Sequence, residues 1–356
     1  MLLQYLLGFR RLGFEVTFLD RLEPEMCGGA RSACSPHTAW LERTLRRFDL
    51  HRSFALYCDG GREVVGLAHE EVVRRVRRAV LFLNVMGFFV ERSVLEAARR
   101  RVFLDIDPGF TQMWRALGQA DVTSGHDTLV TVAENIDRPS CRIPTEGRRW
   151  VTTRPPVVLE HWPAVGGGRH FTTVATWRGP YAPVTWEGET YGLRVHEFRR
   201  FAELPRLTRG AFELALDIHP DDVADLALLR RAGWQLVDPA RVASDPDSYR
   251  AYIRQSQAEL CVAKGMYVQT RSGWISDRSV CYLASGRPVL AQDTGFAENY
   301  PTGEGFLAFS SLEEAAESAE VVRKSPLRHA RAARRVAEEF FDSDRVLRRL
   351  ADEVAA

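Results

Sequence analysis

The sequence predicts an α/β protein in which two similar domains follow one another, each a mostly parallel sheet covered by helices. The chain has 356 residues, which is long enough for two ordinary domains with a core each. Strand-like and helix-like runs alternate along most of it. The alternation is interrupted at residues 149–168, where the chain is extended and rich in proline and glycine, so the boundary is expected there.

The first domain, expected at residues 1–160, opens with helical spacing at 2–12. A doubly wound domain normally begins with a strand and a glycine-rich turn, so this one is predicted to lack its first strand. Either the gene model starts late or the fold differs at this end. Runs rich in β-branched and aromatic residues, alternating with helical patterns, predict strands at 15–19, 53–57, 79–84, 101–106 and 128–133 and helices at 70–78, 94–99 and 110–117.

The second domain is expected at residues 171–356, after a linker at 161–170. The same patterns predict strands at 171–176, 212–217, 234–237 and 306–309 and helices at 220–232 and 247–257. Ser310 or Ser311 is placed to cap a further helix, with Glu313 or Glu314 completing the capping box. Two more helices close the chain, and the last helices can pack back on the first domain.

Residues 267–296 predict a strand, a glycine loop, a helix, a tight turn, a strand and a second glycine loop. The helix is expected to begin with Asp277 as its N-cap and to end at Ser285, because Gly286 follows. A helix N-terminus attracts anions, since its first N–H groups are unpaired and its dipole is positive there. Arg271 and Arg278 flank the turn, so we expect a nucleotide diphosphate at this place.

The functional interpretation of this segment competes with structural ones. Arg278 in a helix's first turn is mildly unfavourable, and an anionic ligand would remove that conflict, although the residue could also face solvent. Gly273 and Gly295 suit the backbone shape that lets a pyrophosphate approach. Trp274 could stack on a base or sugar, or equally be a core residue. Asp277 could be a cap and also take part in the reaction.

The run Ser285-Gly-Arg-Pro-Val-Leu-Ala-Gln-Asp-Thr-Gly295, with a helix before it and Ser311-Leu-Glu-Glu314 after it, resembles the donor half of GT-B glycosyltransferases. The resemblance implies two Rossmann-like domains facing each other across a cleft. It also implies a nucleotide sugar bound mainly on the second domain, with no obligatory metal. One departure is notable: Gly273 and Cys281 stand where many retaining members carry glutamates.

The sequence therefore predicts sugar transfer from a nucleotide-activated donor to an unidentified acceptor, with Asp107 as the acceptor's base and Asp277 as a second catalytic residue. Asp105-Ile-Asp107 also fits a metal motif, but Pro108-Gly109 after it favours a turn. The predicted donor-site residues are Arg178, Arg271, Ser272, Gly273, Trp274, Ser276, Arg278, Asp293, Thr294, Gly295 and Phe296, and the predicted cleft-lining residues are Trp177, Glu134 and Asn135.

Two other functions fit the same architecture: a sugar-nucleotide epimerase and a non-catalytic nucleotide-binding scaffold. The formal net charge of +1 gives no reason to expect a nucleic-acid partner. The six cysteines lack zinc spacing, and no run is long enough to span a bilayer, so a cytoplasmic protein without cofactor or metal is expected. The donor sugar, its base and the oligomeric state stay open.

Overall fold

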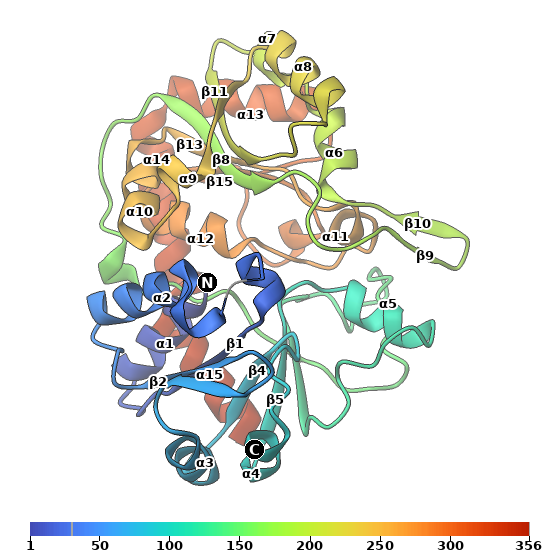
Figure 1. The fold of residues 1–356 in the computed structure, drawn as a ribbon. Coiled ribbons are helices and arrows are strands. Elements are labelled where there is room, and N and C mark those ends of the chain that lie inside the picture. The colour runs from blue at the N-terminus through green and yellow to red at the C-terminus, as the bar shows by residue number, and fades with distance from the viewer. Residues whose placement is uncertain (30, 356) are drawn as a thin grey trace.

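The computed structural model describes residues 1–29 and 31–355, which form two α/β lobes stacked one above the other (Figure 1). Each lobe holds a parallel sheet, of four strands in the first lobe and six in the second. The predicted fold class is therefore confirmed. No helix among the described residues is long and apolar enough to cross a membrane.

The first lobe contains two sheets rather than the single one expected. Its strands are β1 (Phe18–Leu22), β2 (Phe54–Cys58), β3 (Glu63–Gly66), β4 (Phe82–Val85), β5 (Arg101–Asp105), β6 (Thr128–Thr131) and β7 (Val151–Thr152). The order β1-β2-β3 makes a small sheet whose third strand is antiparallel, and β4-β5-β6-β7 are all parallel. The helices are α1 (Leu2–Arg11), α2 (Pro36–Arg47), α3 (His69–Arg78), α4 (Arg92–Ala97) and α5 (Phe110–Ala116).

The second lobe is one doubly wound sheet in the order β12-β11-β8-β13-β14-β15. Its strands are β8 (His170–Thr176), β11 (Ala211–Asp217), β12 (Gln235–Val237), β13 (Ala258–Cys261), β14 (Val289–Gln292) and β15 (Phe306–Phe309). The central strands β13 and β14 are buried along their whole length, as expected of parallel strands covered on both faces. A hairpin of β9 (Val184–Trp186) and β10 (Glu189–Tyr191) projects beside α5 (Figure 1).

Ten helices surround or follow this sheet. They are α6 (Arg194–Arg200), α7 (Leu204–Leu207), α8 (Val223–Ala232), α9 (Pro239–Val242), α10 (Pro246–Gln255), α11 (Gly265–Gln269), α12 (Asp277–Ala284), α13 (Leu312–Lys324), α14 (Pro326–Val336) and α15 (Ser343–Ala355). The last of them crosses back and packs on α1 (Figure 1). Leu347 and Leu350 join a core cluster with Val102 and Val130 of the first lobe, so the end of the chain completes the first domain's core.

Several local predictions were wrong. The residues after 267 were expected to be a strand, but they continue α11, and the strand lies earlier, at β13. The strand expected at 15–19 is β1, three residues further on at Phe18–Leu22. The hairpin β9–β10 was not predicted at all. Its base is fixed to the first lobe by Tyr181, whose ring lies 4.9 Å from that of Trp114, a contact that no local pattern encodes.

Asp105 is a fully buried carboxyl at the end of β5. It accepts hydrogen bonds from Gln112 Nε2 at 2.6 Å, Thr131 Oγ1 at 2.8 Å and the Asp107 N–H at 3.1 Å. Burial nevertheless raises its pKa from 3.8 to about 6, against the opposing effect of the Gln112 and Thr131 bonds. The motif at 105–107 is thus a hydrogen-bonded turn, which is the structural alternative that the sequence favoured.

The raised pKa of Asp105 makes folding depend on pH. The folded protein holds this proton more tightly than the unfolded chain, so protonation stabilises the fold below about pH 4, and that contribution is lost as pH rises through about 6. Asp105→Asn cannot titrate. We expect the wild-type free energy of unfolding, relative to the variant, to fall by about 3 kcal/mol between about pH 4 and about pH 7. Urea titrations across that range measure it.

Asp127→Asn is the control, because bonds from Arg101 outweigh burial and lower the pKa of Asp127. The contribution of Asp127 to stability is present above the ordinary carboxyl pKa and is lost as pH falls. The free energy of unfolding of wild type relative to Asp127→Asn should therefore rise with pH, whereas relative to Asp105→Asn it should fall. If the free energy of unfolding of wild type relative to Asp105→Asn did not change with pH, the raised pKa of Asp105 would be contradicted.

Candidate functional site

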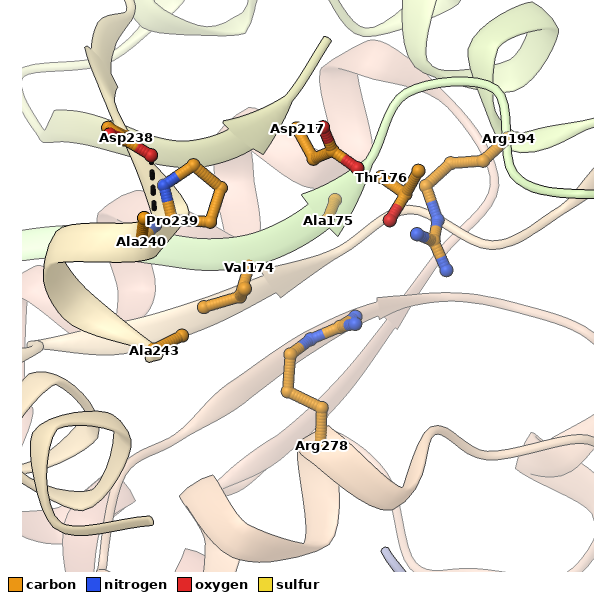
Figure 2. Close-up of a pocket in the computed structure, with 10 residues that line it drawn as sticks. All are labelled: Val174, Ala175, Thr176, Arg194, Asp217, Asp238, Pro239, Ala240, Ala243 and Arg278. Carbon is orange, nitrogen blue, oxygen red and sulfur yellow. Dashed lines mark hydrogen bonds between the residues drawn. The ribbon is translucent and has the colours of Figure 1, made fainter. Parts of the chain in front are cut away.

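A pocket of about 540 Å³ opens at the carboxyl ends of the second lobe's strands, where open α/β sheets bind ligands. Its lining residues come from β8, β11, the β12–α9 connection, α6 and α12: Val174, Ala175, Thr176, Arg194, Asp217, Asp238, Pro239, Ala240, Ala243 and Arg278. Figure 2 shows the guanidinium groups of Arg194 and Arg278 directed into the same space from opposite sides.

Arg278 lies in the first turn of α12 and is anchored below the pocket. Its Nε donates to a carboxylate oxygen of Glu259, which is fully buried in β13, and its Nη2 contacts Cys261 Sγ at 3.3 Å. Burial alone would lower the pKa of Arg278, but the charge of Glu259 raises it well above its ordinary value. The side chain is therefore a fixed cation at the pocket wall.

The helix N-terminus is capped differently from the prediction. Ser276 is the N-cap, and its Oγ accepts from the Arg278 N–H at 3.2 Å. Asp277 is instead the first helical residue, and its side chain is 46% exposed. An acidic residue in the first turn still complements the helix dipole. Ser276 was predicted as a donor-site residue, and its hydroxyl is used here to order the turn that carries Arg278.

Arg194 is the second cation of the pocket and has a different environment. It forms no ion pair with any carboxylate of the described chain, and its Nε is buried without a hydrogen-bond partner. Burial, and after it the nearby charge of Arg278, lowers the pKa of Arg194. Two guanidinium groups facing each other repel, and an anion between them would remove that repulsion and supply hydrogen-bond acceptors.

The opposite end of the pocket is less charged. Val174 and Ala175 of β8 form its floor, and Pro239 and Ala243 flank it from α9. Asp238 is the N-cap of α9, where its Oδ1 accepts from the Ala240 N–H at 2.9 Å, so its carboxylate is already held by the helix (Figure 2). The pocket thus combines an apolar end with a cationic end.

Most of the predicted donor-site residues are buried in the structure or pair with other side chains. Ser272, Trp274, Thr294 and Phe296 are buried, and Trp274 stacks on Tyr267 with ring centres 4.3 Å apart. Asp293 closes its own turn by accepting from the Gly295 N–H at 2.9 Å, and Arg271 pairs with Glu298 at 2.6 Å. Of the residues predicted from the sequence, Arg278 lines the pocket.

Gly273 and Gly295 face the first domain. A Cβ at Gly273 would lie 2.9 Å from the Cγ of Asn135, and one at Gly295 would lie 2.7 Å from its Nδ2. Both glycines have positive φ, of 76° and 89°. We expected their shape to admit a pyrophosphate. In the structure they admit the side chain of Asn135, which reaches them from the loop after β6.

Two residues at the end of β8 differ from the prediction. Trp177 was expected to line the cleft, but it is 1% exposed, and its Nε1 donates to Asp225 Oδ2 at 2.8 Å inside the core. Arg178, expected to clamp a phosphate, is 53% exposed and pairs with Asp222. The chain turns outward after Thr176 toward the β9–β10 hairpin, so it is Arg194, after the hairpin, that returns to the pocket.

Asp107 and Glu134 lie at the contact between the domains. Asp107 accepts from Lys264 Nζ at 2.5 Å and from the hydroxyl of Tyr267, both on the second domain. Glu134 accepts from Arg154 at 2.7 Å and from Tyr300. The role of Asp107 as a base stays a prediction, and its carboxylate would have to exchange one of these partners for an acceptor hydroxyl. Among the described residues, no three His, Cys, Asp or Glu side chains are grouped to hold a metal.

Sequence reasoning missed Arg194, although the signal was present. The argument that singled out Arg278 was that a cation in a helix's first turn is unfavourable without an anion. It applies equally to Arg194, which is the first residue of α6. The hairpin before that helix was not predicted, so no sequence pattern placed Arg194 at the pocket.

Comparison with known proteins agrees with this geometry. The family described as Glycosyl transferase-like matches residues 201–353. No curated protein matches the sequence. Among solved structures, HepE from Anabaena, in complex with UDP-glucose, is 13% identical with a TM-score of 0.56 and covers 96% of this chain and 100% of its own.

Two further structures are similar over nearly their whole length. An alpha-glucosyltransferase bound to UDP-glucose and DNA is 11% identical with a TM-score of 0.54, covering 96% of this chain and 99% of its own. A glycosyltransferase from Rickettsia africae is 10% identical with a TM-score of 0.50, covering 96% and 98%. The fold is thus of the GT-B type. Residues 201–353, within the second domain, are similar to the glycosyl transferase-like family, which confirms the resemblance seen in the sequence.

The close approach of Asn135 can be tested at Gly295. Gly295→Ala places a methyl group 2.7 Å from Asn135 Nδ2 and 3.0 Å from the Arg271 carbonyl oxygen. Gly303→Ala is the matched control, because Gly303 has a similar φ of 102° and nothing within 4 Å of the added Cβ. Both variants strain the backbone. We expect Gly295→Ala to lower the free energy of unfolding by about 1–3 kcal/mol more than the control, measured by urea denaturation. Equal losses would mean that only the backbone conformation matters.

Proposed function

We propose that the protein is a glycosyltransferase that takes its sugar from a uridine diphosphate donor and passes it to an acceptor still to be identified. The observation that carries this proposal is the pair of facing guanidiniums, Arg194 and Arg278, at the carboxyl edge of the second sheet. The second domain matches a glycosyl transferase-like family, and two proteins of similar fold were solved with UDP-glucose.

In this proposal the nucleoside lies at the apolar end of the pocket, between Val174 and Ala243, and the diphosphate lies between the arginines. When the bond from the sugar to the diphosphate breaks, negative charge grows on the departing phosphate. Arg278 is held by Glu259 before the reaction, and Arg278 and Arg194 together would stabilise that charge. They supply the positive charge for which other enzymes use a metal ion, so we expect transfer without an added divalent cation.

The acceptor would bind on the first domain, and Asp107 remains the candidate base there. Its carboxylate pairs with Lys264 of the second domain at 2.5 Å. Burial lowers the pKa of Lys264, against the opposing charge of Asp107. The epimerase alternative would need histidine and acidic side chains around the sugar. The described lining of the pocket includes two carboxylates and no histidine, which favours transfer.

Calorimetry with UDP, UDP-sugars and the other nucleoside diphosphates tests the proposal. We expect UDP to bind, and Arg194→Ala to weaken its affinity about 10- to 100-fold, because a charge-assisted phosphate contact contributes roughly 1.5–3 kcal/mol. Arg194 is the better target than Arg278, since removing Arg278 would leave Glu259 buried without its partner.

Arg178→Ala is the control for this experiment. Arg178 also follows the β8 strand but is bound to Asp222 and half-exposed, so its loss should leave UDP affinity within about twofold of wild type. Absence of binding by every nucleoside diphosphate to the folded wild-type protein would refute the proposed function. Equal losses in the two variants would show that the pocket's arginines are wrongly assigned.

A further inference from the structure

Asn135 makes an unusual set of contacts for one side chain. It is fully buried in the loop after β6 of the first domain. Its Nδ2 donates to the carbonyl oxygens of Arg271 at 3.1 Å and Gly295 at 3.0 Å. Its Oδ1 accepts from Asn299 Nδ2 at 2.8 Å, and its backbone N–H donates to the Ser272 carbonyl at 3.1 Å. Every one of these partners belongs to the second domain.

The two loops that Asn135 joins are also bonded to each other. The Gly273 N–H donates to the Thr294 carbonyl at 2.8 Å, and Thr294 Oγ1 donates to the Trp274 carbonyl at 2.7 Å. The first of these loops runs directly into Ser276, the cap of α12. Asn135 therefore docks the first domain against the pair of loops beside the helix that carries Arg278.

The amide group is specific for this place. Two carbonyl oxygens need two N–H donors, which the Asn135 side chain supplies while its oxygen remains free for Asn299. An aspartate has the same shape, but its carboxylate oxygens would face the two carbonyl oxygens with no N–H to donate. The absence of a Cβ at Gly273 and Gly295 lets the amide come this close. The Asn135 amide on the first domain thus matches the two glycine loops on the second in size, polarity and backbone shape.

Arg138, on the same loop, makes a more exposed contact with the second domain. It pairs with Glu298 at 2.8 Å, with the two side chains 40% and 36% exposed, and its Nη2 also donates to Asn299 Oδ1 at 2.5 Å. Exposed ion pairs contribute little, whereas a buried amide left without partners is costly. Asn135 is consequently the buried side chain through which this loop of the first domain meets the two glycine loops of the second.

We propose that Asn135 is a positioning residue that holds the first domain against the two glycine loops beside α12, so that acceptor-side groups face the donor. Its effect on turnover rests on the proposed function, whereas its hold on the loops does not. The arginine pocket lies within the second domain, where Glu259 anchors Arg278 independently of the first domain. Losing the amide should therefore impair turnover while leaving nucleotide affinity intact.

The experiment compares Asn135→Ala and Asn135→Asp with Arg138→Ala as the matched control on the same loop. Hydrogen exchange is followed in peptides covering residues 270–276 and 293–299, and UDP affinity by calorimetry. Turnover is followed as UDP released from UDP-glucose, with water taking the sugar in place of the unidentified acceptor. In both Asn135 variants we expect exchange to rise and turnover to fall on the order of tenfold, with UDP affinity within about twofold of wild type. The control should stay near wild type in all three.

Asn299→Ala removes the bond onto Asn135 Oδ1 and the one that Asn299 Oδ1 accepts from Arg138 Nη2, but it leaves both Nδ2 bonds of Asn135 in place. It should give a smaller rise in exchange in the same peptides, so the proposal can be tested even if Asn135→Ala unfolds. Unchanged exchange at both loops in a folded Asn135 variant overturns the proposal, as does an Arg138→Ala effect of equal size. A parallel loss of UDP affinity in Asn135→Ala would also overturn it, since the residue would then shape the pocket itself. If wild type binds no UDP, the proposed function fails and the exchange measurements still decide whether Asn135 holds the loops.

Discussion

The site depends on one buried ion pair, between Glu259 in the middle of the second sheet and Arg278 in the first turn of α12. Glu259 is completely buried, so removing either partner would leave an uncompensated charge at a cost of about 3–5 kcal/mol. This requirement fixes α12 over β13 and directs the free end of the guanidinium into the pocket (Figure 2). A helix terminus that could otherwise fray becomes a rigid part of the pocket wall.

The same pair explains why two arginines are present. Glu259 offsets much of the charge of Arg278, which therefore contributes position and hydrogen-bond donors more than net attraction. Arg194 has no such partner among the described residues, so an anionic ligand would be its first charged partner. Holding one paired and one unpaired guanidinium together is less costly than burying two unpaired ones, and both still face the space where the diphosphate is proposed to lie.

The sequence predicted those features that are encoded locally. Short apolar runs predicted the strands of the second sheet except β13, and the Ser285-Gly286 turn marked the end of α12, because helix stops and buried strands depend on neighbouring residues. The function of the glycines could not be predicted in this way. Position 295 has no room for a Cβ because the side chain of Asn135, 160 residues earlier, packs against it. Arg194 reaches the pocket only because an unpredicted hairpin carries the chain away from it and back.

Two positions that are glutamates in many retaining GT-B enzymes, Gly273 and Cys281, carry no acidic side chain in this chain. Cys281 is buried and its Sγ contacts the Asp277 carbonyl at 3.3 Å, while burial raises the pKa of its thiol, so it supplies no charge. Gly273 has no side chain and faces Asn135. At the start of α12, Arg278 and the helix N–H groups lie beside a single carboxylate, that of Asp277, which is 46% exposed. In the proposed reaction, the candidate base Asp107 comes from the first domain, at the boundary that Asn135 also occupies. Under that proposal, the acceptor site and the joining of the two domains share one surface.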